Sequence, residues 1–224
     1  MVRGERDYTQ RVLAQIRPTG ILGGRLVMFE DFESINNKGS PFDVQLVHTS
    51  DAQEVYDGDG ACEMKLTTIQ PYSWALSFPC PTEDEIGIEF AFKPSDLTLT
   101  RIEATVAVYT GTTLHAPSLR LDASGALLTM EIINSDFEQE VVHTFTSKEI
   151  ISSWHVLYMG FNLTERKYRM LQFDNYRYPP SDKAYPTSAA TMTPWANLSI
   201  NGRALSATYM SMFFDNVIIV YEEI

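Results

Sequence analysis

The sequence predicts an all-β protein in which two antiparallel sheets pack face to face. The first observation is a period of two in apolar residues, as in Ile86, Ile88, Phe90 and Phe92, which is typical of strands buried on one face. Residues 102–109 repeat that alternation. The second observation is that turn-forming residues separate the runs, and the third is that no segment after the opening arm has a long helical period.

Residues 1–25 are predicted to form an N-terminal arm with a short helix. Asp7 is placed to cap the helix, and Pro18 with the glycines after it would end it. The arm holds five arginines against two acidic residues and carries +3, so the remainder of this −12 chain carries −15. So short a helix needs a surface, either its own domain or a neighbouring subunit. The residues expected to dock the arm are Arg3, Arg6, Tyr8, Arg11, Val12, Leu13 and Ile16.

Residues 26–224 are predicted to form one sandwich domain of about a dozen short strands. After an opening strand, the expected strands cover residues 42–48, 61–68, 74–78, 86–92, 102–109, 126–133, 138–145, 154–162, 167–173, 204–213 and 214–221. Asp174 and Asn175, between two aromatic residues, are typical of a tight hairpin turn. Such a chain of hairpins favours antiparallel pairing throughout.

Residues 176–196 are predicted to be a long irregular segment, because four prolines interrupt them. Ordered loops of this length are often functional, and this one is rich in aromatic residues. Aromatic rings stack on sugar rings but are also enriched at subunit interfaces, so a glycan and a protein partner both remain open. The candidate binding residues are Tyr109, Tyr176, Tyr178, Tyr185 and Trp195.

Composition bounds the partners and the compartment. A net charge of −12 disfavours nucleic acid and anionic membranes, because both are bound largely through Lys and Arg. Cys62 and Cys80 show no metal-binding or disulfide pattern and are predicted to be core thiols. The sequence shows no signal peptide and no apolar stretch of bilayer length. We therefore expect synthesis in the cytoplasm, with incorporation into a virion as one destination.

Four short motifs, in order, resemble the concanavalin A-like lectin and glucanase jelly-roll superfamily. They are Phe29-Glu-Asp-Phe-Glu33, Gly58-Asp-Gly-Ala-Cys-Glu-Met-Lys-Leu66, Trp154-His-Val-Leu157 and Phe214-Asp-Asn-Val217. The resemblance covers roughly residues 26–224 and implies a jelly roll whose first and last strands are neighbours. The superfamily includes laminin-G-like domains, carbohydrate-binding modules, glucanases and noncatalytic phage virion proteins, so the fold alone does not choose a function.

The resemblance also implies a structural calcium ion between the first and last strands. The matching positions are Asp31 or Glu33 on one side and Asp215 on the other. Carboxylate and carbonyl oxygens are the ligands that Ca²⁺ prefers. The alternative is that these acids simply end strands in water. No other cofactor is expected.

No catalytic pattern is complete. Glu85 and Glu89 share a strand face, as acids do in glucanases of this fold, but Gly87 stands where the glucanase pattern has its middle acid. A solvated strand face is therefore the preferred interpretation. His155, beside Trp154 in an alternating run, is predicted to be a structural histidine, and Trp74 and Trp154 are predicted to be core residues.

The sequence thus predicts a noncatalytic structural or interaction protein. The first hypothesis is a virion assembly component, either a capsid decoration or a tail-associated protein, that docks through its arm and forms homo-oligomers. The alternative is a carbohydrate-binding module. A glucanase-like glycoside hydrolase is the third and least favoured hypothesis, because the strand pattern fails at Gly87.

Overall fold

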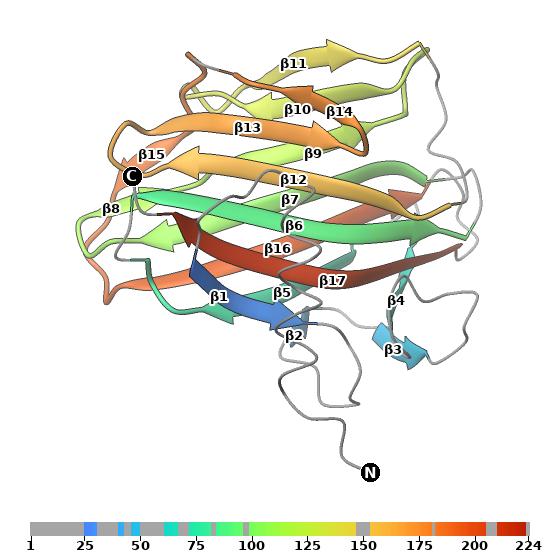
Figure 1. The fold of residues 1–224 in the computed structure, drawn as a ribbon, viewed down its shortest axis with the longest axis horizontal. Helices are drawn as coiled ribbons and strands as arrows, with labels where there is room; N and C mark the ends of the chain where they lie inside the picture. Colours follow the sequence, from blue (N-terminus) through green and yellow to red (C-terminus); the bar gives the residue numbers. More distant parts are fainter. Residues whose placement is uncertain are drawn as a thin grey trace.

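The computed structural model describes residues 25–30, 40–42, 46–49, 61–66, 72–81, 84–95, 99–146, 153–180, 182–204 and 210–222. Within these ranges all regular structure is β-strand, and the strands form two antiparallel sheets that pack face to face (Figure 1). The predicted all-β sandwich is confirmed. The predicted arm, apart from Arg25, lies outside the described residues. No helix in the described ranges is long and apolar enough to cross a bilayer.

The first sheet, called sheet A, has the order β14-β13-β12-β6-β17-β4-β3, and β1 also pairs with β17. Its strands run in front of the second sheet in the view of Figure 1. Their bounds are β1 Arg25–Glu30, β3 Leu46–Thr49, β4 Ala61–Leu66, β6 Glu85–Pro94, β12 His155–Asn162, β13 Lys167–Phe173, β14 Tyr176–Tyr178 and β17 Met210–Glu222.

The second sheet, called sheet B, has the order β11-β10-β9-β7-β16-β5-β2, with β8 attached to β7 and β15 attached to β8. The strands of sheet B have the bounds β2 Ser40–Phe42, β5 Tyr72–Phe78, β7 Leu99–Tyr109, β8 Thr113–His115, β9 Ser118–Asp122, β10 Thr129–Ile133, β11 Gln139–Thr144, β15 Thr187–Ala189 and β16 Trp195–Ala204.

The first and last strands are neighbours, as the sequence predicted. One edge of β17 pairs with β6, while the other pairs first with β4 and then with β1. In the pairing with β1, Phe29 lies opposite Ile218 and Glu30 lies opposite Val217. The first and last strands of the domain therefore lie side by side in sheet A (Figure 1).

The core lies between the sheets and follows the predicted alternation. Ile86, Ile88, Phe90 and Phe92 of β6 are buried, as are the even-numbered residues 102–108 of β7. Trp74 is fully buried, as predicted, and its ring meets that of Phe214 edge to face at 5.2 Å. Each large apolar side chain buried in this way contributes roughly 1.5–3 kcal/mol.

The other predicted core residues divide between buried and half-buried. Cys62 is buried and Cys80 is half-buried, and both thiols are free. Trp154 is half-buried rather than fully in the core. His155 is confirmed as a structural histidine, because it is buried and its Nδ1 lies 2.8 Å from Asp174 Oδ2.

Three predicted segments are wrong. The run predicted at 42–48 is divided between β2 in sheet B and β3 in sheet A. The strand predicted at 204–213 is instead β16, which ends at Ala204, followed by β17 from Met210. The segment predicted as irregular at 176–196 contains β14 and β15. β2, β14 and β15 have three residues each, too few for local patterns to distinguish them from the loops around them.

Candidate functional site

The outer face of sheet B carries a double row of polar and aromatic side chains along β7 and β16. Because successive side chains of a strand point to opposite faces, the odd-numbered residues of both strands face away from the core. The strands are in register, which places Trp195 opposite Tyr109 and Arg203 opposite Arg101. We call this row the β7–β16 strip, and its residues are Arg101, Glu103, Thr105, Ala107, Tyr109, Trp195, Asn197, Ser199, Asn201 and Arg203.

An aromatic pair closes one end of the strip. The rings of Tyr109 and Trp195 are stacked, with centroids 4.6 Å apart and planes at 24°. Trp195 is 37% exposed although it is a large apolar side chain. Cross-strand aromatic pairs stabilise a sheet, and stacking on Tyr109 holds the indole in one orientation. The pair therefore offers a rigid aromatic surface to a ligand.

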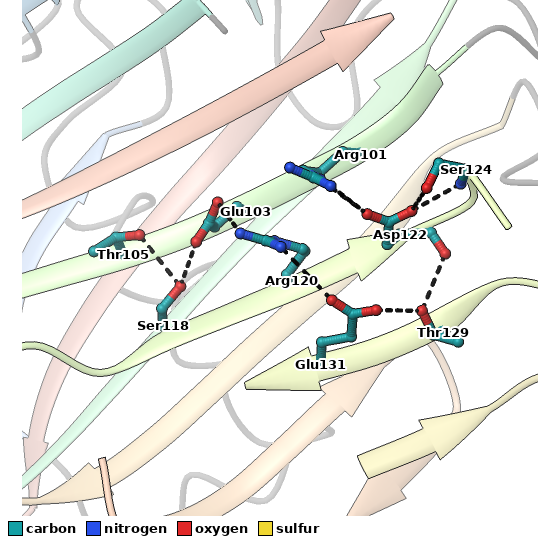
Figure 2. A network of polar contacts seen from close by, with 9 residues as sticks. All are labelled: Arg101, Glu103, Thr105, Ser118, Arg120, Asp122, Ser124, Thr129 and Glu131. Atoms are coloured by element: carbon teal, nitrogen blue, oxygen red, sulfur yellow. Dashed lines mark hydrogen bonds and ion pairs between the residues drawn. The ribbon is translucent and has the colours of Figure 1, made fainter. Parts of the chain in front are cut away.

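The opposite end of the strip is ordered by ion pairs (Figure 2). Arg101 donates from Nε and Nη2 to Asp122 Oδ2, at 2.9 and 2.7 Å. The other oxygen of Asp122 accepts hydrogen bonds from the amide and the hydroxyl of Ser124, the amide at 2.8 Å. Burial alone would raise the pKa of Asp122, but the hydrogen bonds from Ser124 and Arg101 outweigh burial and hold that pKa below its usual value. Asp122 is therefore a carboxylate that fixes Arg101.

A second arginine lies deeper in the same network. Arg120, only 7% exposed, donates from Nη2 to Glu103 at 3.2 Å, and its Nη1 lies 3.7 Å from Glu131 (Figure 2). Glu103 also accepts a hydrogen bond from Ser118 Oγ at 2.8 Å. Thr129 donates to Glu131 at 2.8 Å. Glu103 is held by two hydrogen-bond donors, and Glu131 by one donor and one ion pair, so the side chains are pre-positioned.

A shallow hollow of about 290 Å³ opens on the strip beside this network. Arg101, Glu103, Asn201, Gly202 and Arg203 line it. Gly202 faces the core, where a Cβ would stand 2.7 Å from Leu66 Cδ1, so the strand backbone forms part of the floor. The strip thus presents an aromatic pair at one end and a charged, hydrogen-bonding hollow at the other.

Of the five aromatic residues predicted to bind a ligand, the structure brings only Tyr109 and Trp195 together. Tyr185 is 1% exposed, and its hydroxyl donates to the carbonyl of Asn162 at 2.8 Å. Its ring cannot stack on a ligand, and this part of the prediction is wrong. Tyr176 and Tyr178 lie on β14, at the end of sheet A, and the Tyr176 hydroxyl lies 2.7 Å from His143 Nδ1.

The predicted calcium ligands are only partly described. Asp215 is fully buried on β17 and accepts a hydrogen bond from the amide of Asn216 at 2.7 Å. Asn216 has a φ of 49° where the ladder to β6 shifts register. Asp31 and Glu33 lie outside the described residues. Across the ranges that the structure describes, no three acidic, histidine or cysteine side chains form a metal-binding group, and the calcium ion stays a prediction.

The strand predicted as a solvated acidic face is different in the structure. Glu89 is 8% exposed, which corrects that prediction, and Glu85 is bound by Arg169 Nε at 2.8 Å. Gly87 pairs with Gly160, and a Cβ on either would stand within 2.9 Å of the Tyr158 hydroxyl. The Tyr158 ring therefore occupies the place where the glucanase pattern would have its middle acid.

Sequence reasoning missed most of the strip. It did not assign Arg101 of the strip, or Arg120 and Asp122 of the neighbouring β9, to a site, and it treated β16 as partly irregular. The signal was present in β16, where Ala196, Leu198 and Ile200 are buried and alternate with polar residues. Asn and Ser at those polar positions favour turns in local patterns, which concealed the strand.

Comparisons with known proteins show the fold and leave the family open. No protein-family model matches the chain, and no curated protein matches its sequence significantly. Among solved structures, a carbohydrate esterase from Shiga toxin-encoding bacteriophage phi24B is similar, with a TM-score of 0.57 and 14% identity, over 89% of this chain and 100% of that one.

Two further solved structures have the same fold. An endo-β-1,4-glucuronan lyase from the fungus Trichoderma reesei has a TM-score of 0.52 and 12% identity, over 88% of this chain and 96% of that one. The CBM2 module of the evolved Dit protein of Lactobacillus casei BL23 phage J-1 has a TM-score of 0.51 and 8% identity, over 90% and 97%. The structural neighbours thus include phage proteins, a carbohydrate-binding module and a lyase.

Proposed function

We propose that this protein is a noncatalytic glycan-binding β-sandwich that holds its ligand along the β7–β16 strip. The observation that carries the proposal is the exposed Trp195 stacked on Tyr109 at the end of an open polar row. Of the sequence hypotheses, the carbohydrate-binding module is therefore the one that this geometry supports best.

The chemistry of the strip suits a sugar chain. A pyranose ring presents an apolar face that packs on an aromatic ring, and its hydroxyl groups need donors and acceptors nearby. Asn197, Ser199 and Asn201 supply both along β16, and all three are half-buried and so remain accessible. The Ser199 hydroxyl already donates to Asn197 Oδ1 at 3.2 Å, which orders that amide.

The similar structures support the proposal without carrying it. They are a carbohydrate esterase, a glucuronan lyase and a CBM2 module, and the first and last come from phages. Identities of 8–14% show a shared fold only. The proposal that this chain is noncatalytic is supported by Tyr158, which covers the position of the missing glucanase acid.

A glycan array with the wild-type protein and the Trp195→Ala variant tests the proposal. We expect the wild type to bind a set of glycans and Trp195→Ala to lose more than tenfold in affinity for them, as for a stacked aromatic anchor. Phe137→Ala is the matched control, because Phe137 is an aromatic residue 64% exposed in the turn before β11. Absence of glycan binding by the wild type, or equal losses of affinity in the two variants, would reject the strip as the glycan-binding site.

A virion assembly role is a second candidate, favoured by the charge of the arm. A +3 segment before a −15 body makes one copy complementary to the next. Similarity to two phage proteins supports the same setting. Deletion of residues 1–24 tests this role, because it leaves β1 intact. If the arm docks on a neighbouring copy, light scattering should show homo-oligomers for the full chain and monomers for the truncated chain. Glycan binding should persist in both. An unchanged assembly state would exclude docking by the arm.

A further inference from the structure

The hollow at the far end of the strip is lined by two arginines on adjacent strands. Arg101 and Arg203 lie directly opposite each other in the register of β7 and β16. Asp122 already offsets the charge of Arg101. Both guanidinium groups nevertheless line the hollow, so an anion there would meet N–H donors from two adjacent strands.

Arg101 is already held in a binding geometry. Its contact with Asp122 uses Nε and Nη2, so the guanidinium plane is fixed before any ligand arrives. A fixed planar fork loses little side-chain entropy on binding and matches the geometry of a carboxylate. Asn201, also on the rim of the hollow, adds an amide that donates hydrogen bonds.

The acidic residues near the hollow are compensated within the protein. Glu103, the carboxylate in the lining, is bound by Ser118 and by the buried Arg120. Across the network and the rim, Arg101, Arg120 and Arg203 balance Glu103, Asp122 and Glu131. The described side chains of this region therefore carry no net charge, on a chain of net charge −12, and a ligand anion meets less repulsion from them than over the acidic body.

We propose that the ligand of the strip is an anionic glycan chain whose carboxylate group, on a uronic acid residue, occupies the hollow between Arg101 and Arg203. This inference rests on the proposed function. Trp195 and Arg203 are eight residues apart on β16, roughly 26 Å at strand spacing. One chain several sugars long would reach from the aromatic pair to the hollow, so stacking supplies affinity and the arginines select the charge.

The experiment is a titration with uronic acid oligosaccharides and with neutral oligosaccharides of the same length and linkage. Both are chosen from an array that also includes sulfated glycans without uronic acid. For Arg203→Gln we expect about a tenfold or larger loss of affinity for the uronic acid oligosaccharides. Its affinity for neutral chains of the same length should fall much less, so its preference for uronic acid chains over neutral chains should shrink. Arg177→Gln is the matched control, since Arg177 is exposed on β14 in the other sheet.

Arg101→Gln should show the same selective loss. Its circular dichroism spectrum is compared with that of the wild type, because Asp122 loses one of its hydrogen-bond partners. Added salt should weaken the binding of uronic acid chains and leave neutral chains unaffected. Equal wild-type affinity for both classes, together with an unchanged Arg203→Gln, would overturn this inference while the glycan-binding function stands. A preference for sulfated chains would show that the hollow does not select a uronic acid carboxylate. Absence of binding to any glycan would reject the proposed function itself.

Discussion

At the scale of single residues, one buried hydroxyl joins the two sheets. Tyr168 of β13 in sheet A accepts a hydrogen bond from the amide of Ser118 in sheet B at 2.9 Å. Its own proton can go to the carbonyl of Ser118 at 3.0 Å or to that of Ile133 at 2.9 Å. The phenol is fully buried, so these bonds replace water on the groups that they join.

Tyr168→Phe is therefore expected to destabilise the protein by about 1–3 kcal/mol, because the backbone groups of Ser118 and Ile133 lose a buried partner. The free energy of unfolding, measured by denaturant titration, checks this. Tyr178→Phe, at a half-buried residue on β14, should change it by less than about 0.5 kcal/mol. Equal effects of the two substitutions would show that Tyr168 does not join the sheets.

The same burial predicts a loss of stability in alkali. Burial raises the pKa of Tyr168 and of Tyr185 above the ordinary tyrosine value. Above about pH 10 the unfolded chain releases these protons and the folded protein keeps them, so stability is full below that pH and falls as the pH rises. Each tyrosine contributes up to about 1.4 kcal/mol per pH unit there. Denaturant titrations between about pH 9 and pH 11 should show the fall, with a shallower slope in Tyr168→Phe, and a flat profile would refute it.

At the scale of strands, the predictable elements are those with one apolar and one polar face. In β6 and β7 the residues that face the core are β-branched, aromatic or small apolar, so the alternation was visible in the sequence. In β16 the inner positions end in Gly202 and Ala204 and the outer ones include three amide and hydroxyl residues. The strand is stabilised by β5 and β7 on its two sides, and that tertiary pairing is invisible to local patterns.

Gly202 lies where β16 packs closely on sheet A. An added Cβ would stand 2.7 Å from Leu66 Cδ1 and 3.3 Å from Met212 Cε, both buried in sheet A. Gly202→Ala should therefore cost about 1–3 kcal/mol through overpacking. Gly125→Ala is the control, since its Cβ would meet only a backbone oxygen at 3.9 Å. Thermal unfolding of both variants tests this, and a Gly202→Ala protein as stable as the control would contradict it.

At the scale of the whole molecule, the sequence predicted the two-sheet sandwich and the adjacency of the first and last strands. It could not predict the site, because the strip exists only through the register of β7 with β16, and these strands are far apart in the chain. Trp195 and Tyr109 were recognised as separate aromatic residues, but their stacking was not. The burial of Tyr185 likewise depends on its contacts with Phe161 and Tyr168 across the fold.

Calcium is the remaining whole-molecule prediction from the sequence. An ion held by Asp215 together with Asp31 or Glu33 would join the two ends of the domain and stabilise the folded protein by mass action. Calorimetry should then show a higher transition temperature with calcium than with a chelator, and Asp215→Asn should remove the difference. The same transition temperature in both conditions would exclude the ion.

The measurement that tests the account most directly is a crystal structure of the protein with its best glycan ligand. The account predicts a sugar ring packed on Trp195 beside Tyr109, with the chain continuing over Asn197 and Asn201 toward Arg203. A glycan bound on sheet A, or at the edge of the sandwich away from β7 and β16, would contradict it.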